Sequence, residues 1–571
     1  MDNQDLIQPG NGVVSIVPLS GGQDGDDAMS MGMPQTSTEE KEGVVSVVPP
    51  TSFKFLRGLP PFWHDRLIEV GLILSMGLYY LVGNVHLGAS SFLHIPPDLY
   101  SFPFLVLFAC LSWYRLSFAV ALLPMALPYY FIQKTVLSYG SRNFDFSLAE
   151  ISLFICVLVA LGQFLLRGRQ WRYYLPFAEL RSRLGPFAIP ILIFVAAALA
   201  SIAVAVVRAT ALRAFREEVF DPLLYMLLAL CCLRTRQDVQ RLVAAFLGSA
   251  LIIASVGLMQ YFFFAQLLQD GSRVHAMYGS ANSIGLFFDY ALPLGMALLI
   301  FQAQKALHLR DKWWLCLLLL VAFVPLLGVL ILSQSLGATL ALPIALLFIL
   351  ALSVRSRKVL LLGAGVLLVL ALGAGVVLYK PLTHIITNWH DNSKGISTFT
   401  KRYYLWLSAI NMIRQHAWFG VGMDNWLCYY SPNGQCLASY TLHTHFWILQ
   451  IPGTHLPTGL QDEPDLSHPH DIFLHVWVSI GIFGLLAFVA ILALFSWLFT
   501  RIVRTVRRSV QAEVSSLEWM VLGVGGALLA ALCQGLIDSA FLEQDLAFCF
   551  WMLVTALLIL RVLTGTSWRK L

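Results

Sequence analysis

The sequence has few charged side chains: they make up 12% of its 571 residues, whereas 58% of the residues are hydrophobic. Water-soluble proteins carry about 25% charged residues, so this composition excludes a soluble multidomain protein. The basic residues lie between long apolar runs, and the net charge of +5 therefore gives no reason to expect a nucleic-acid partner. A run of roughly 20 apolar residues is long enough for one transmembrane helix. The composition predicts a polytopic helical membrane protein surrounded by membrane lipids.

Residues 1 to about 50 lack both long apolar runs and helical periodicity, and Gly, Pro, Ser, Asp and Glu are frequent in them. Such a segment cannot bury enough apolar surface to fold. It also lacks the basic stretch followed by an apolar core that marks a signal peptide. We therefore expect a disordered tail, which the orientation derived below puts in the cytoplasm.

The apolar runs predict an all-α fold with about 12–14 transmembrane helices. The second and third runs are short and almost continuous at Arg115, so they form either two spans or a re-entrant hairpin. The fourteen expected spans lie at about 67–87, 99–113, 116–132, 147–166, 187–207, 219–233, 242–264, 284–303, 313–333, 337–353, 359–379, 472–499, 518–537 and 546–561.

The distribution of Lys and Arg predicts the orientation, because basic residues gather in cytoplasmic loops. Most of the 37 basic residues fall on one side if the N-terminus is cytoplasmic. The expected organisation is a tail at 1–50, eleven helices at 51–379, a large, partly helical outward-facing loop at 380–470, and three helices at 471–571. Eight of the 14 histidines lie in that loop. We therefore expect the chemistry on the outer face, with part of the active site in the loop.

Cysteine is scarce, with nine residues, and seven of them lie within or beside apolar runs. There a thiol acts as a small apolar side chain. The other two, Cys428 and Cys436, flank a Pro-Asn-Gly turn in the outer loop. In an oxidising compartment this spacing predicts a disulfide bond. A metal-binding pair is the alternative, but the sequence offers no matching second pair.

Two basic residues stand out on the expected outer side. Arg273 precedes the segment YGSANS, in which Asn282 can cap the following helix. Arg402 begins an amphipathic segment that carries Trp406 at helical spacing. A guanidinium group at a membrane surface suits bidentate binding of phosphate or carboxylate. The alternative is that these side chains reach out to lipid headgroups.

A further basic pair, Arg213 and Arg216, lies in the segment RATALRAFREEVFD. Its mixed charges include Glu217 and Glu218, as in an amphipathic helix at a membrane interface. For this pair we favour an interfacial role over ligand binding.

Three segments together resemble the O-antigen ligase and polymerase superfamily, membrane glycosyltransferases that use polyprenyl-diphosphate-linked glycans. They are RVHAMYGSANSIGLFFDYALPLG, KRYYLWLSAINMIRQHAWFGVGMDNW and HPHDIFLHVWVSIGIFGLLAF, within about residues 273–485. They are similar to the family's Arg before an Asn-containing turn, its Arg-x3-Trp helix leading to a Gly-x-Gly turn, and its His-x-His-Asn segment at the start of a helix.

The resemblance implies that Arg273 and Arg402 bind the donor diphosphate and that His470 is the essential histidine. Asp471 departs from the family, which usually has Asn there. It either raises the basicity of a neighbouring histidine or caps the helix. The expected catalytic residues are His470, Arg402, Arg273 and His468, and the expected substrate-binding residues are Arg273, Arg402, Asn282, Trp406 and Asp471.

The histidines before the last long apolar segment allow other interpretations. His468, His470, Asp471 and His475 include enough ligand types for a zinc site, which needs three or four. His470 can also be a structural residue at a helix start. The resemblance favours a general base or acceptor-positioning role for His470, because a pKa near 6.5 suits proton transfer at neutral pH. On that interpretation neither a metal nor another cofactor is needed.

The function implied by the resemblance is an inverting, metal-independent glycosyltransferase in the bacterial cytoplasmic membrane. Its site would face outward, its donor would be a glycan on undecaprenyl diphosphate, and its acceptor a glycan, lipid or protein. The sequence does not separate a ligase from a polymerase. The alternative is a lipid-linked oligosaccharide transporter, or flippase, which we would expect to carry ionisable residues near the midplane of its spans. A structural scaffold would explain the helices but not the arginines and histidines.

Overall fold

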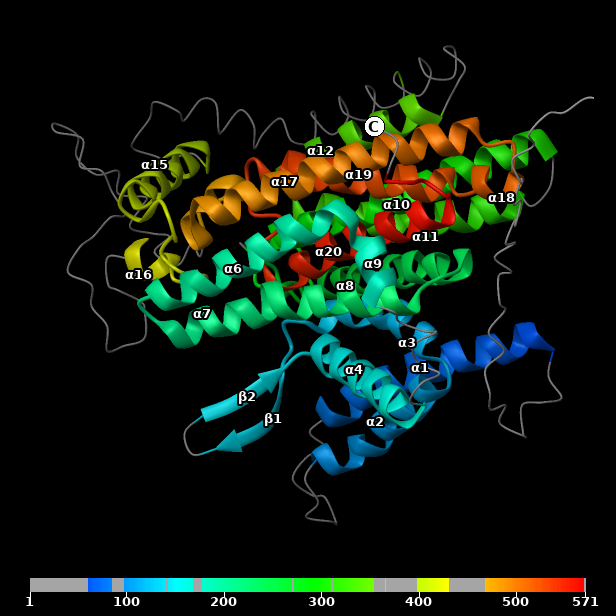
Figure 1. Ribbon diagram of the computed structural model, residues 1–571, viewed down its shortest axis with the longest axis horizontal. Coiled ribbons are helices and arrows are strands. Elements are labelled where there is room, and N and C mark those ends of the chain that lie inside the picture. The colour runs from blue at the N-terminus through cyan, green and yellow to red at the C-terminus, as the bar shows by residue number, and fades with distance from the viewer. Residues whose placement is uncertain are drawn as a thin grey trace, which may run out of the picture. The chain divides into compact units, whose positions relative to one another are not determined.

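The computed structural model describes residues 60–84, 97–139, 142–167, 177–269, 272–309, 313–353, 365, 398–430 and 468–568. Helices make up most of these residues (Figure 1), which confirms the predicted all-α polytopic membrane fold. The expected tail at 1–50 and, apart from residue 365, the expected span at 359–379 lie outside the described residues.

The elements are labelled as in Figure 1. The helices are α1 (Pro61–Asn84), α2 (Pro97–Tyr114), α3 (Leu116–Leu122), α4 (Leu148–Arg167), α5 (Phe177–Leu184), α6 (Ala188–Val204), α7 (Arg208–Ala214), α8 (Asp221–Cys232), α9 (Arg236–Phe263), α10 (Ala281–Leu309), α11 (Trp313–Ser333), α12 (Leu336–Ser353), α15 (Thr398–His416), α16 (Trp426–Tyr430), α17 (Ile472–Arg508), α18 (Ala512–Ser515), α19 (Glu518–Gly535) and α20 (Gln544–Leu563). The 3-10 turns are η2 (Leu123–Tyr129), η4 (Gly185–Phe187) and η6 (Ala265–Leu267), and η5 (Phe215–Phe220) is π-helical.

Nine helical segments in the described part of the chain are long and apolar enough to cross a membrane. They are α4, α9, α10, α11, α12, α17, α20 and two segments that join shorter elements, Glu179–Val204 and Ala512–Gly535. Five expected spans are not among these nine: those at 99–113, 116–132 and 219–233 form shorter apolar helices, the one at 67–87 lies in α1, and the one at 359–379 lies, apart from residue 365, outside the described residues. Arg115 separates two of the shorter helices, α2 and α3.

One departure from the all-α prediction is a short antiparallel hairpin, β1 (Lys134–Tyr139) and β2 (Arg142–Phe146). Its register pairs Lys134 with Phe146 and Tyr139 with Arg142. Lys134 anchors the start of the hairpin, since its Nζ donates a hydrogen bond to the Tyr79 carbonyl at 3.1 Å and lies 4.4 Å from the centre of that ring. The hairpin follows directly on Gln133, which lines the site described below.

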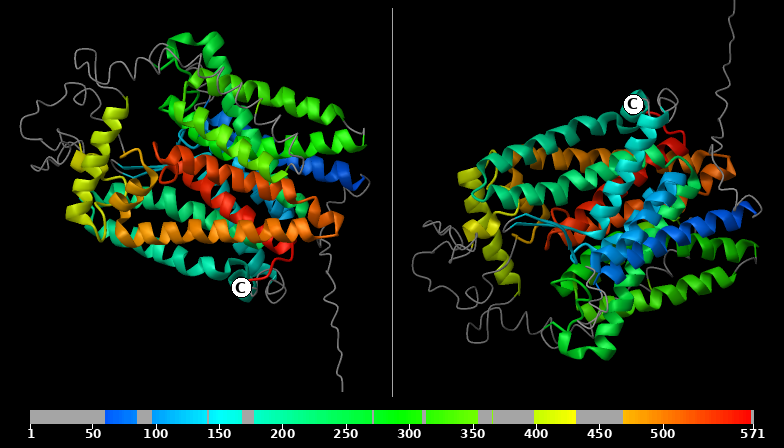
Figure 2. Two further views of the ribbon diagram at one scale, coloured as in Figure 1. Left: turned by 90° about the horizontal axis from the view of Figure 1, so that it is seen from above. Right: turned by 90° about the horizontal axis from the view of Figure 1, so that it is seen from below.

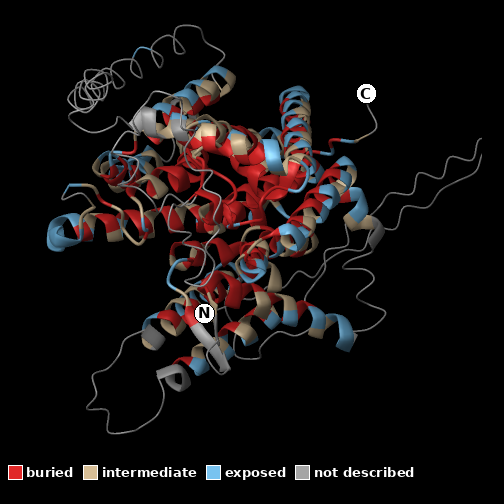
Figure 3. Cartoon of the chain, turned by 90° about the vertical axis from the view of Figure 1, so that its left-hand side faces the viewer, coloured by how far each residue is buried: buried red, intermediate tan, exposed pale blue. Residues whose placement is uncertain are grey.

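The core of the bundle lies around α20. The apolar window of α20 is 89% buried, whereas that of α11 is only 22% buried, so α20 is central and α11 peripheral. Figure 3 shows the buried residues gathered in the interior of the bundle. Small residues allow α19 to approach α10 closely: a Cβ on Gly523 would lie 3.0 Å from the Cα of Leu294. Such close packing is typical of helices in membranes, where van der Waals contact stabilises association.

Helix α17 is broken near its start, and the break holds the preceding loop helix in place. Gly481 has a φ of +78°, and a Cβ there would collide with the backbone of Trp418. The segment after α15 contacts the break through backbone hydrogen bonds from Val421 to the Val478 carbonyl (2.8 Å) and from Ile482 to the Ala417 carbonyl (2.9 Å). Figure 2 shows α15 lying across the end of the bundle helices. The break therefore fixes α15 relative to the start of α17.

Candidate active site

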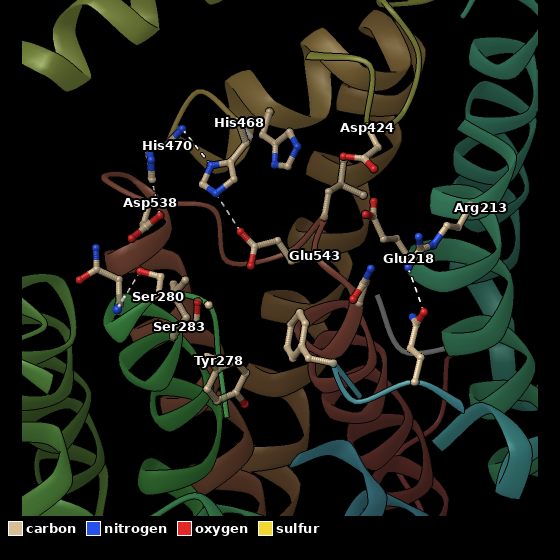
Figure 4. Close-up of a pocket in the computed structure, with 18 residues that line it drawn as sticks. Arg213, Glu218, Tyr278, Ser280, Ser283, Asp424, His468, His470, Asp538 and Glu543 are labelled. Carbon is tan, nitrogen blue, oxygen red and sulfur yellow. Dashed lines mark hydrogen bonds and ion pairs between the residues drawn. The ribbon is translucent and has the colours of Figure 1, made fainter. Parts of the chain in front are cut away.

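Three of the expected site residues, His468, His470 and Asn282, line a cavity of about 670 Å³ near the start of α17. His468 and His470 line it from the segment before α17, and Asp538 and Glu543 line it from the loop between α19 and α20. Figure 4 shows these four side chains grouped on one wall. Asn282, at the start of α10, lines another part of the cavity.

His470 and Asp538 form the closest polar pair of this wall. Nδ1 of His470 lies 2.7 Å from Oδ1 of Asp538, and the same oxygen accepts the backbone N–H of Ser539 at 2.9 Å. An ionised carboxylate can only accept hydrogen bonds, so the ring proton of neutral His470 is on Nδ1. Its Nε2 has no hydrogen-bond partner among the described residues and keeps a lone pair to accept a proton.

The electrostatics of this pair favour a neutral imidazole on an ionised carboxylate. Burial lowers the pKa of His470, and the neighbouring His468 lowers it further, while Asp538 partly opposes them. Burial alone would raise the pKa of Asp538, but the charge and hydrogen bond of His470, together with Arg402, bring it below its usual range. A histidine in this state can act as a general base near neutral pH.

The backbone of His470 is held in a rare conformation. Its φ is +55°, in the left-handed region that non-glycine residues seldom occupy. Trp406 of α15 supports it by donating its Nε1–H to the His470 carbonyl at 3.4 Å. Strained backbone of this kind costs about 1–3 kcal/mol and concentrates at functional sites.

His468 supports His470 and contacts Glu543. Its Nδ1 accepts the backbone N–H of His470 at 3.3 Å, so its ring proton is on Nε2, which donates to Oε1 of Glu543 at 2.9 Å. Burial lowers the pKa of His468 to about 4, while burial and the charge of Asp538 raise the pKa of Glu543 to about 8. At neutral pH the two groups therefore form a neutral hydrogen bond rather than an ion pair.

Arg402 reaches the wall through Asp538. Its guanidinium donates to the Ile537 carbonyl and lies 3.7 Å from Oδ2 of Asp538. Trp406 is one helical turn further along α15, so both side chains meet the same region from the same helix face. The structure thus brings Arg402, Trp406 and His470 together, as the resemblance implies.

Arg273 lies behind Asn282. Its Nε donates to the Ser333 carbonyl at 3.1 Å, and its second guanidinium nitrogen donates to the side-chain oxygen of Asn282 at 2.7 Å. Asn282 lines the cavity, so Arg273 is linked to the cavity by its hydrogen bond to that amide. Among the described residues that line the cavity itself, the only arginine is Arg213 of α7, for which the sequence favoured an interfacial role.

Asp471 caps helix α17. Its Oδ1 accepts the backbone N–H groups of Phe473 (2.9 Å) and Leu474 (2.8 Å), which is the geometry of an N-cap. Of the two roles left open by the sequence, the structure has the cap, and the carboxylate that touches His470 is Asp538. The expected contact of Asp471 with substrate stays a prediction.

Cys428 is disulfide-bonded, whereas its expected partner, Cys436, lies outside the described residues. The pairing of these two cysteines stays a prediction.

A metal ion has one candidate site in the described part of the chain. Ligand atoms of His468, His470 and Asp538 lie within 4.8 Å of one another. The set differs from the one suggested by the sequence, because Asp538 takes the place of Asp471 and His475. His475 instead pairs with the hydroxyl of Ser539, with Nδ1 2.5 Å from its oxygen.

Sequence reasoning missed Asp538 and Glu543. The only signal was three acidic residues, Asp538, Glu543 and Asp545, in the short interval before the last apolar run. Charges are scarce in this chain, so their clustering there was informative.

Comparison with known proteins gives one family. Residues 321–489 match the model of a family described as O-antigen ligase. That range contains α15, the Gly481 break and the histidines of the cavity wall. No curated protein matches the chain.

Proposed function

Because the chain belongs to the O-antigen ligase/polymerase superfamily through its domain at residues 321–489, we propose that it is an inverting glycosyltransferase. Its donor is a glycan on undecaprenyl diphosphate, and its acceptor is a glycan, lipid or protein. The site lies on the outer face of the cytoplasmic membrane. The observation that carries the proposal is the His470–Asp538 pair on the wall of a polar cavity, with Arg402 bound to the same carboxylate.

The reaction is a single displacement. The acceptor hydroxyl oxygen forms a bond to the anomeric carbon, and its proton passes to Nε2 of His470. The bond from that carbon to the phosphate oxygen breaks, and its electron pair leaves with the polyprenyl diphosphate. Asp538 holds the histidine in the required tautomer and stabilises the imidazolium that forms. Attack opposite the leaving group inverts the anomeric centre.

Arg402 and Arg273 stabilise the leaving group. Negative charge grows on the diphosphate as its bond to the sugar breaks, and guanidinium groups bind phosphate in a bidentate way. Arg402 is held at the His470 end by Asp538 and Ile537, and Arg273 is held behind Asn282. A fixed guanidinium beside His470 and another behind Asn282 are both suited to binding a diphosphate. We propose that they remove the need for a metal ion.

The test is to incubate the purified protein with a synthetic undecaprenyl-diphosphate glycan and candidate acceptors. We expect release of undecaprenyl diphosphate together with a longer or newly glycosylated acceptor, and strongly reduced product formation with His470→Ala. Product whose anomeric configuration matches the donor would overturn the inverting mechanism. Movement of the intact glycolipid across vesicles without bond cleavage would favour the transporter alternative.

The same assay tests metal independence. We expect full activity after treatment with EDTA. Loss of activity that is restored by added Zn²⁺ would instead assign His468, His470 and Asp538 to a metal site.

A further inference from the structure

The cavity has a second polar end that the proposed reaction does not use. Its lining side chains come from segments that are far apart in the sequence: Gln133 before β1, Arg213 in α7, Glu218 in η5, Asp424 before α16 and Gln544 at the start of α20. Figure 4 shows Arg213, Glu218 and Asp424 on the side of the cavity opposite Asp538. We call these five residues the distal end.

A buried carboxylate holds three of these side chains in place. Glu217 is 1% exposed, and its Oε1 accepts from Nε of Arg213 at 3.0 Å and from the amide of Gln133 at 3.5 Å. Its other oxygen, Oε2, accepts from the amide of Gln544 at 2.6 Å. Arg213 also donates to the side-chain oxygen of Gln133 at 3.1 Å. The distal end is therefore a fixed array of polar groups.

Two acceptor groups of the distal end remain available. The carboxylates of Glu218 and Asp424 have no hydrogen-bond or ion-pair partner among the described residues, and both line the cavity. Asp424 has a φ of +53°, so its backbone adopts the same strained, left-handed conformation as that of His470. The ring of Phe131 is 40% exposed and forms an adjoining wall, packed edge-on against Tyr278 at 5.3 Å.

We propose that the distal end binds a sugar residue of the acceptor. This rests on the proposed function. Sugar hydroxyls donate hydrogen bonds that free carboxylates accept, and the fixed amides can bind both hydroxyl hydrogens and oxygens. An aromatic ring beside such groups offers an apolar face for a sugar ring.

The position of the distal end fits the geometry of the displacement. His470, the proposed base, lies on the wall that Asp538 forms, so the attacking hydroxyl must point towards that wall. Glu218 and Asp424 lie on the other side of the cavity from Asp538 (Figure 4). An acceptor sugar held there would present its hydroxyl towards His470.

The test compares Glu218→Gln and Asp424→Asn with Glu513→Gln, an exposed glutamate of α18, as the control. We expect each site variant to raise the acceptor KM about 10-fold, as for the loss of one or two hydrogen bonds. The donor KM and the kcat at saturating acceptor should stay near wild type. Since neither carboxylate has a structural partner, both variants should fold, which a thermal melt verifies.

A binding titration makes the result independent of catalysis. Acceptor saccharide without its lipid is titrated into wild-type protein and into Asp424→Asn, with no donor present. We expect binding to weaken in the variant by the same factor as the KM. Unchanged acceptor binding and KM in both variants, or an effect on the donor KM instead, would overturn the proposal. Absence of transfer by wild type would refute the proposed function separately, since the titration would still report on the distal end.

Discussion

Nδ1 of His470 lies 2.7 Å from Oδ1 of Asp538, although the two residues are 68 positions apart in the sequence. One belongs to the segment before α17 and the other to the loop between α19 and α20. A local helix cap cannot explain this contact, because the cap of α17 is Asp471. The pairing fixes the tautomer of a histidine that lines a large polar cavity, and this is what a general base requires.

We predict that His470→Ala and Asp538→Asn both reduce transfer by about 10²- to 10⁴-fold, the usual contribution of a general base. Asparagine can donate as well as accept, so Asp538→Asn no longer enforces the proton on Nδ1. Donor binding should change little in His470→Ala, because the histidine acts on the acceptor. Initial rates and donor affinity measure this, with His64→Ala, in α1 and outside the cavity lining, as the histidine control. Normal turnover in His470→Ala would reduce the histidine to a structural role.

Substitutions of Arg402 test whether the planar shape of its guanidinium group matters for activity. Arg402→Ala should lower kcat by about 10²- to 10³-fold, as for loss of one donor to a developing negative charge. Arg402→Lys keeps the charge but loses the planar fork, so it should recover only part of the rate. Arg504→Lys, at an exposed position near the end of α17, is the control. Full activity of Arg402→Lys would show that charge alone suffices.

The fold class and part of the site could be predicted from the sequence, because hydropathy and local motifs carry that information. Asp538 was missed because its contact with His470 depends on how α17, α19 and α20 pack. From the sequence, Gly481 resembles a small residue at a helix–helix interface. In the structure its φ of +78° interrupts α17, and the segment after α15 forms backbone hydrogen bonds with the residues around this break. Arg213 was assigned to the membrane interface because its contact with Gln133, 80 positions away, depends on the packing of distant segments.

The pH dependence should report the His470–Asp538 pair. The base must be deprotonated, so kcat/KM should fall as the pH drops through the pKa of His470, which burial and His468 place below 6.5. Asp538 opposes that shift, so its loss should lower the pKa further. The acid limb of the residual activity of Asp538→Asn should therefore move to lower pH. A limb that moves to higher pH, or does not move, would contradict this assignment.

The break in α17 provides a test of how the site is positioned. Gly481→Ala introduces a Cβ that collides with the Trp418 backbone and forces a residue with a side chain to a φ of +78°. A backbone with this φ and a ψ of −176° is essentially confined to glycine and costs other residues about 1–3 kcal/mol, so the protein should be destabilised by at least this amount. Gly77→Ala is the matched control, because a Cβ there meets nothing within 4 Å and its helix lies away from the cavity. It should be neutral or stabilise the protein by about 0.5–1 kcal/mol. Thermal unfolding in detergent measures both.

Because the break anchors α15, Gly481→Ala should also displace Arg402 and Trp406 and weaken donor binding. Wild-type stability and donor affinity in Gly481→Ala would show that α15 is positioned by other contacts.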